Sequence, residues 1–504
     1  MGVIAKQSIK GTIVTYLGVA VGFVTTFFVI TRFLSAEDIG LARVMIDAAT
    51  LFIGLAQLGT SASILRFYPY FAEPSEVRGQ KPEEHGFFFW TIVVPMVGFL
   101  LVALLFMVCY APLSEWFGEK SPLFVNYYYL VLPLAFFMLY QTVFETNANV
   151  RMRIVFPRAV RELLTRVGLL AVYLLYAFDV VTTDGFVWSL VGVYAVAALC
   201  NTVYLFSLGG VSLKPDFAYL RQNPGIVRKY LLYTAFLVLS AVVSVLAPTL
   251  SSFFITAQMG LSYTGIFAIA TYMAMMVSIP YRSLTAIAAP QLSLAIKHDD
   301  REQISHQLTQ VSGNLLLIGG LILALMWVNI DLIFAILPNG ATYAVARRTV
   351  LLLGIGQLCV ATFQFTVTAL SYSRYYPFTL LFSLVLTVLA LLLNNLFIPR
   401  WGIDGAALAT LTAQVSYYLI ALITVRLALG SRIFTRRHLL TILLLVLLFA
   451  ANALCLRYLP VGTIWLSSLL RTLLVVAVAA LAYQWRISPE INEYIHALFH
   501  RIRL

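Results

Sequence analysis

Charged residues are scarce in this sequence, since Asp, Glu, Lys and Arg together make up only 11% of its 504 residues. A water-soluble protein of this length needs far more charge on its surface, so the composition excludes that class. Hydrophobic residues reach 61% instead and gather in blocks of roughly 20, the length of a helix that spans the bilayer hydrocarbon. Backbone polar groups in lipid must bond within their own segment. The composition therefore predicts an all-α integral membrane protein.

Cysteines and catalytic motifs are equally sparse. The four cysteines each lie in a different apolar block and without metal-ligand spacing: Cys109, Cys200, Cys359 and Cys455. They are predicted to be buried thiols that pack as small hydrophobic groups. The chain has no phosphate-binding Gly-rich loop, no His/Cys metal motif and no segment resembling a soluble ATPase. Carboxylates in the predicted outer loops stand in turns of a few residues, where a capping role is expected. The sequence thus predicts no enzyme, no cofactor and no metal site.

Hydropathy predicts about fourteen transmembrane helices joined by short polar connections. The predicted spans are 11–33, 40–66, 87–110, 124–148, 159–178, 186–208, 231–257, 264–292, 311–334, 346–371, 376–397, 403–427, 438–459 and 461–484. The run 11–33 is too long for a signal peptide and is expected to remain as the first span. After the last span, apolar residues at helical spacing predict a basic amphipathic tail, 485–504, on the membrane surface; a plain solvated helix is the alternative.

The net charge of +12 is distributed unevenly across the predicted membrane. With the N-terminus inside, most Lys and Arg fall in the predicted cytoplasmic connections. The basic residues at or near the outer side are Arg32, Arg43, Lys120, Arg347, Arg348, Arg400 and Arg457. This asymmetry follows the positive-inside rule and predicts that both termini are cytoplasmic. It explains the basic balance without a nucleic-acid partner.

The basic segment 209–230 predicts a division into two six-helix lobes. The expected domains are 1–208, the linker 209–230, the second lobe 231–427, an appended helix pair 428–484 and the tail 485–504. An offset of 225 residues relates the lobes, because it places Ile30 on Ile255, Thr31 on Thr256 and Gly40 on Gly265. Parallel repeats are a known transporter plan. Chance similarity between apolar hairpins is the alternative.

Polar residues at membrane depth are the candidates for function, because they are costly there unless they face a cavity or a partner. The second span carries a polar stripe at helical spacing: Arg43, Asp47, Thr50, Gly54, Gln57 and Ser61. We expect Gln57 to line a substrate path. Arg43 and Asp47 belong either to that path or to an i,i+4 ion pair.

The eighth span carries a matching stripe, and Arg282 is its charged member. The stripe consists of Thr271, Ser278, Arg282 and Thr285, and Pro280 is expected to kink the helix. The 225-residue offset places Gln57 on Arg282, so the two are predicted to face each other between the lobes. Arg282 is therefore the leading candidate for contacting substrate.

Arg66 and Arg166 are further candidates. Arg66, at the predicted cytoplasmic mouth, is alternatively a topology anchor. Arg166 alternatively extends toward the interface. Glu145 is expected to neutralise a neighbour such as Arg151.

Three stretches resemble the polysaccharide transport family, the lipid-linked oligosaccharide (O-antigen type) flippases of the multidrug/oligosaccharidyl-lipid/polysaccharide (MOP) exporter superfamily. They are Ile30–Gly40 with the helix that follows, Pro280–Ser293 and Phe397–Thr410. The resemblance implies two helical bundles around a cationic cavity that work by alternating access. It also implies transport of a polyprenyl-pyrophosphate-linked oligosaccharide across the bacterial inner membrane.

The implied partners are this substrate, membrane lipids, a coupling ion and polysaccharide polymerase or ligase machinery. Two other functions stay open. A multidrug or cation antiporter of the same superfamily needs a carboxylate within the bundle. A membrane glycosyltransferase or polymerase needs a larger outer loop than this chain has.

Overall fold

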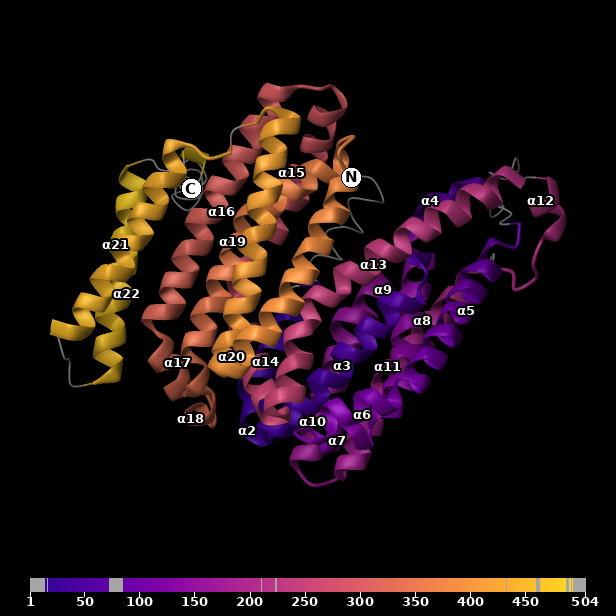
Figure 1. Cartoon of the computed structure of the whole chain (residues 1–504), viewed down its shortest axis with the longest axis horizontal. Coiled ribbons are helices and arrows are strands. Elements are labelled where there is room, and N and C mark those ends of the chain that lie inside the picture. The colour runs from indigo at the N-terminus through magenta and orange to yellow at the C-terminus, as the bar shows by residue number, and fades with distance from the viewer. Residues whose placement is uncertain are drawn as a thin grey trace, which may run out of the picture. The chain divides into compact units, whose positions relative to one another are not determined.

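The computed structural model describes residues 14–15, 17–71, 85–209, 211–222, 224–431, 433–458, 463–485, 489–490 and 492. These residues form helices and contain no β-strand, which confirms the predicted all-helical membrane fold (Figure 1). In this part of the chain ten helices are long and apolar enough to cross a membrane, and Leu17–Phe33 and Val245–Met259 are shorter apolar helices. The count of fourteen spans stays a prediction. Most of the predicted amphipathic tail lies outside the described residues.

The chain divides into two compact units, residues 1–265 and 266–504. The elements of the first unit are η1 (Thr25–Ile30), α2 (Thr31–Phe33), α3 (Ala36–Ala56), α4 (Thr60–Phe71), α5 (Phe87–Val108), α6 (Tyr110–Gly118), α7 (Pro122–Asn126), η2 (Tyr128–Leu130), α8 (Val131–Val150), α9 (Val155–Ala159), η3 (Val160–Leu164), α10 (Thr165–Ala177), α11 (Thr183–Leu208), α12 (Phe217–Gln222) and α13 (Pro224–Met259). By its contacts, α13 belongs to this unit, where it packs on α3 and α4.

Helix α3 is central to the first unit and packs against α5, α8 and α13. Small residues allow these close approaches: a Cβ on Gly54 would lie 2.9 Å from the Val245 side chain of α13. The helix begins with a capping box in which Ser35 and Asp38 satisfy each other's backbone N–H groups. It ends at Ala56, and Leu58 and Gly59 just beyond it both have positive φ angles. The predicted second span, 40–66, is therefore interrupted between α3 and α4.

Two turns of π-helix occur among the described residues of the first unit. Thr25–Ile30 forms η1 in the first span, and Val160–Leu164 forms η3 between α9 and α10. A π-turn holds one residue more than an α-turn and often accompanies a functional site. Here η3 changes the direction of the side chains on either side of it.

The segment before α12 is fastened to the start of α5. His85 Nδ1 lies 3.3 Å from Asp216 Oδ2, and the His85 ring stacks on Tyr219 at 4.3 Å. Gly86 has a φ of 68°, and a Cβ on it would lie 2.5 Å from the backbone nitrogen of Asp216. Glycine is therefore required at this close approach.

The second unit is arranged around α16. Helix α14 (Leu261–Met275) begins in the first unit and continues into the second. The other elements are η4 (Met276–Ser278), α15 (Ile279–Lys297), α16 (Arg301–Val328), α17 (Ile330–Ile336), α18 (Gly340–Tyr343), η5 (Ala344–Ala346), α19 (Arg347–Tyr372), α20 (Pro377–Leu429), α21 (Arg436–Tyr458) and α22 (Ile464–Gln484). Helix α16 packs against α15, α19, α21 and α22.

Helices α20, α21 and α22 complete this unit. Gly402, with φ 56° and ψ −135°, kinks α20 between the predicted spans 376–397 and 403–427. Only glycine adopts such a conformation at low cost. Helices α21 and α22 lie side by side (Figure 1) and cover α16 with buried residues such as Leu448 and Val475.

Candidate functional site

The predicted polar stripe of α3 contains a closed ion pair. Arg43 Nε lies 2.8 Å from Asp47 Oδ2, and both side chains are largely shielded from solvent. One turn beyond the end of α3, the Ser61 hydroxyl donates a hydrogen bond to Gln57 Oε1 at 3.3 Å. The i,i+4 geometry that the spacing allowed is therefore formed. A role of Arg43 and Asp47 in binding substrate stays a prediction.

Arg166 ends a chain of four alternating charges that begins on α8. The Glu145 carboxylate, 8% exposed, lies 2.9 Å from Arg161 Nη1. Glu162 lies between Arg161, at 3.4 Å, and Arg166, at 3.1 Å. Arg166 also donates to the Gly18 carbonyl at 2.7 Å. Its charge is therefore balanced by Glu162 and tied to the first span.

The partner of Glu145 differs from the one that the sequence suggested. Glu145 pairs with Arg161, whereas Arg151 donates to the Asn147 carbonyl at 2.7 Å. The sequence pattern did not identify Arg161 and Glu162 as members of a charge network. Only the i,i+4 spacing of Glu162 and Arg166 signalled part of this chain.

Neutral polar side chains in the first unit also bond to one another. The Asn147 amide donates to the Thr91 hydroxyl at 3.1 Å, and the Gln141 amide donates to the Thr165 hydroxyl at 3.3 Å. These groups join α8 to α5 and α10. Such bonds hold the helices in register and remove the cost of burying the groups.

Arg66 is a cation without a carboxylate partner in the described part of the chain. It lies on α4 with its side chain exposed, and its guanidinium carbon is 4.2 Å from the centroid of the Tyr233 ring on α13. A cation over an aromatic face is held in place while its N–H donors remain available. Arg66 is thus oriented but not neutralised.

Arg282 is the second such cation. Its exposed side chain is in the first turn of α15, directly after the 3₁₀ turn η4, and no described residue forms an ion pair with it. The turn η4 ends two residues before Pro280, where the sequence predicted a kink, and the kink itself stays a prediction. The neighbouring hydroxyls of Thr271 and Thr285 donate to carbonyls of their own helices. Arg282 is therefore the polar group of its stripe that remains available to a ligand. The predicted facing of Gln57 and Arg282 stays a prediction.

Charge compensation thus separates the candidate residues into two classes. The membrane-depth carboxylates Asp47 and Glu145 each have an arginine partner, whereas Arg66 and Arg282 have no carboxylate among the described residues. A guanidinium group that is free to donate favours an anionic ligand, and phosphate oxygens match its planar fork. Within the described residues, no group of three His, Cys, Asp or Glu side chains is placed to hold a metal ion.

Residues 4–294 match the family described as polysaccharide biosynthesis protein. The chain belongs to this family. The match covers more than half of the chain, including α3, α4 and all of the 3₁₀ break at Arg282. No curated protein sequence matches the chain.

Solved structures of membrane transporters share the fold of this polysaccharide biosynthesis family member. The lipid II flippase MurJ in an inward closed conformation has a TM-score of 0.66 and 13% identity, covering 95% of this chain and 100% of that one. An inward-facing multidrug resistance MATE family transporter of the MOP superfamily has a TM-score of 0.63 and 12% identity, over 81% and 94% of the two chains. A MOP superfamily transporter from Pyrococcus furiosus has a TM-score of 0.56 and 12% identity, over 85% and 95%. At these identities the likeness shows the fold.

Proposed function

We propose that this protein is a flippase for a polyprenyl-pyrophosphate-linked oligosaccharide. It moves the sugar from the cytoplasmic to the outer face of the bacterial inner membrane by alternating access, for assembly of surface polysaccharide or lipopolysaccharide such as O-antigen. The observation that carries the proposal is the charge balance: Asp47 and Glu145 are neutralised, whereas Arg66 and Arg282 have no carboxylate in the described chain. An arginine with available donors in either unit suits a phosphate group of the pyrophosphate. Membership of the polysaccharide biosynthesis family supports the same substrate class.

A cation or multidrug antiporter is the second candidate function, since a MATE transporter shares the fold. A cationic substrate needs a carboxylate that is free to bind it. The two membrane-depth carboxylates that would serve, Asp47 and Glu145, lie 2.8 and 2.9 Å from arginine nitrogens. This geometry favours the flippase.

The membrane potential supplies a driving force for the proposed transport. An interior-negative potential favours outward movement of an anion by about 2.3 kcal/mol per charge per 100 mV. Counterflow of a coupling ion would add to this force. In the proposed setting both termini are cytoplasmic, and the product passes to polymerase or ligase machinery at the outer face.

The test is a deletion of the gene in its host, complemented with variants. The deletion is expected to abolish surface polysaccharide and to trap lipid-linked oligosaccharide on the cytoplasmic face. Arg66→Ala and Arg282→Ala are expected to fail in complementation at normal protein levels. The matched control is Arg400→Ala, which removes an exposed arginine on a different helix, α20. This variant is expected to complement.

One result would overturn the proposal, and another would remove Arg282 from it. Normal surface glycan in the deletion strain, together with new sensitivity to cationic dyes, would assign the antiporter function. Complementation by Arg282→Ala at wild-type efficiency would remove Arg282 from the substrate path.

A further inference from the structure

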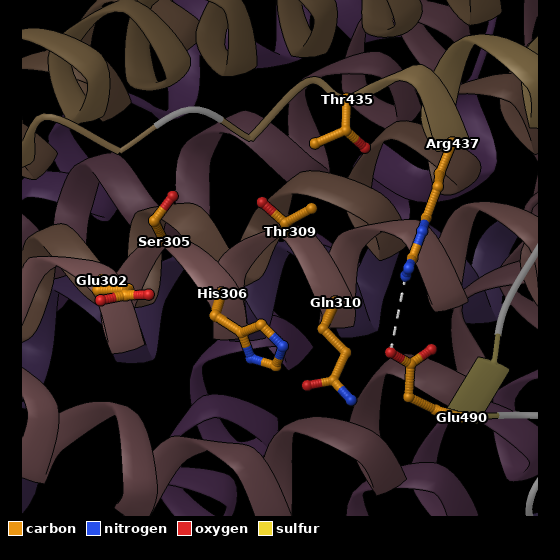
Figure 2. A pocket seen from close by; sticks show the side chains of 8 residues that line it. All are labelled: Glu302, Ser305, His306, Thr309, Gln310, Thr435, Arg437 and Glu490. Atoms are coloured by element: carbon orange, nitrogen blue, oxygen red, sulfur yellow. Dashed lines mark ion pairs between the residues drawn. The ribbon is translucent and has the colours of Figure 1, made fainter.

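A polar cleft of about 620 Å³ lies in the second unit, at the N-terminal end of α16 (Figure 2). One face of α16 contributes Glu302, Ser305, His306, Thr309 and Gln310; Thr435 and Arg437 come from the start of α21, and Glu490 from the C-terminal segment. After Gln310 the sequence of α16 becomes largely apolar. The cleft therefore lies where the polar end of a spanning helix meets its apolar part, which is the headgroup level of a membrane.

The walls of the cleft are held by buried contacts. Behind the polar face of α16, Ile304 and Leu308 are buried in the core of the unit. His438, fully buried on α21, lies 2.9 Å from the Ser312 hydroxyl of α16 and 3.0 Å from the Thr435 hydroxyl. The start of α21 is thus fixed against α16 beside the cleft, so the site is preformed.

The charged side chains of the cleft carry too much negative charge to bind an anion that has no cation of its own. Arg437 Nη1 lies 3.8 Å from Glu490 Oε1, shown by the dashed line in Figure 2, so its charge is compensated. Glu302 stands at the other end of the α16 face and has no ion pair among the described residues. Two carboxylates and one guanidinium leave the lining one negative charge in excess when His306 is neutral. A ligand that fits this lining carries a cation, which the excess negative charge attracts, and a phosphate, to which Arg437 and the hydroxyls can donate.

An apolar surface continues from the cleft along α21. Leu439, Leu440 and Leu443 follow Arg437 and are 63%, 42% and 55% exposed. On a membrane helix such leucines face lipid. Acyl chains can therefore lie on α21 while a headgroup occupies the cleft.

We propose that this cleft binds a phospholipid whose headgroup carries a primary ammonium, as in phosphatidylethanolamine. The ammonium group binds the Glu302 carboxylate. The phosphate accepts hydrogen bonds from the hydroxyls of the α16 face and from Arg437, and the acyl chains lie against α21. The bound lipid joins α16 to α21 and the C-terminal segment, independently of what the protein transports.

The test is native mass spectrometry of the full chain in detergent with added phosphatidylethanolamine, phosphatidylcholine or phosphatidylglycerol. We expect phosphatidylethanolamine to be retained about fivefold better than phosphatidylglycerol, the effect of one exposed charge pair. It is also expected to be retained better than phosphatidylcholine, whose quaternary ammonium has no N–H to donate to Glu302. Glu302→Gln is expected to remove this preference. Glu302→Lys is expected to shift it to phosphatidylglycerol, because the lining then carries one positive charge in excess.

The matched control is Glu119→Gln, which removes a carboxylate that is 83% exposed in the first unit. This variant is expected to keep the wild-type preference. Equal retention of the three lipids by the wild type would overturn the proposal. So would a preference that survives Glu302→Gln, or one that Glu119→Gln removes equally. Because Glu302 is exposed, these variants are expected to fold, and size-exclusion chromatography checks this.

Discussion

Gly40 and Gly265 meet backbone to backbone at the starts of α3 and α14, and neither has room for a side chain. A Cβ on Gly40 would lie 1.9 Å from the Leu261 carbonyl oxygen, and a Cβ on Gly265 would lie 2.0 Å from the Ala36 carbonyl oxygen. The contact is reciprocal, because an offset of 225 residues carries Ala36 onto Leu261 and Gly40 onto Gly265. This symmetry supports the internal repeat that the sequence suggested.

Alanine at either glycine is expected to destabilise the protein. The added methyl group would overlap a backbone carbonyl that cannot rotate away, at a cost of about 3 kcal/mol. The measurement is the apparent Tm of Gly40→Ala and Gly265→Ala in detergent. Gly192→Ala on α11 is the control, since a Cβ there meets nothing within 4 Å. Equal Tm values for all three variants would contradict the close contact.

Asp47→Ala is expected to lower stability by about 3 kcal/mol, because it removes the carboxylate that balances the charge of Arg43 in a poorly solvated place. Replacing both residues, as in Arg43→Met with Asp47→Leu, is expected to restore stability. If the pair is structural, the double variant also transports normally, which the complementation assay measures. A stable double variant that fails to transport would show that the pair belongs to the substrate path.

Arg161→Ala is expected to destabilise the first unit by about 2 kcal/mol, since the buried Glu145 would lose its nearest counter-ion, while the lost guanidinium is itself half exposed. Adding Glu145→Gln is expected to recover most of the loss. Thermal unfolding in detergent measures both effects. Arg153→Ala removes an exposed arginine nearby and serves as the control. A similar loss in Arg153→Ala would argue against a specific pair.

The attachment of α12 to the start of α5 is expected to persist until the solution is strongly acidic. A hydrogen bond from the Tyr219 backbone N–H, assisted by His85, holds the pKa of Asp216 below its ordinary value. A lowered pKa in the folded state stabilises the attachment while the carboxylate is charged, and this contribution is lost as the pH falls through that pKa.

Hydrogen exchange of the α12 amides measures this dependence. Protection, corrected for intrinsic rates, is expected to be constant from neutral pH to about pH 5 and to fall only below about pH 4. Asp216→Asn is expected to lose protection at every pH. Asp299→Asn, in an exposed turn of the second unit, is the control. Protection that falls between pH 7 and 5 would assign the attachment to a different group.

The helical fold was predictable because an apolar run in lipid has one way to satisfy its backbone. The ends of the helices and the breaks within them were harder to predict. Apolar periodicity continues through Leu58 and Gly59, and only their positive φ angles reveal that α3 ends there. Gly402 fell in a predicted loop, whereas the helix resumes at once across the kink. Local sequence pattern does not encode such angles.

The pairing of charges was predictable only within one helix. Arg43 and Asp47 are four residues apart, so their proximity follows from helix geometry. Arg151 follows Glu145 by six residues, which places it on a different face of the helix. The actual partner, Arg161, is 16 residues away and beyond a loop, and its position depends on the η3 turn. Tertiary placement of this kind is not visible in spacing.

The π-turn η3 makes the length of the chain there as important as its composition. It contains Arg161, which pairs with Glu145, and it precedes Arg166, which donates to the Gly18 carbonyl. Removing one residue would convert the turn to an α-turn and rotate everything after it by about 100°. Arg166 would then point away from the first span. Natural relatives with this charge chain should therefore vary at the other three positions of 160–164 while sharing the residue count of the segment, and those positions should tolerate substitution far better than deletion.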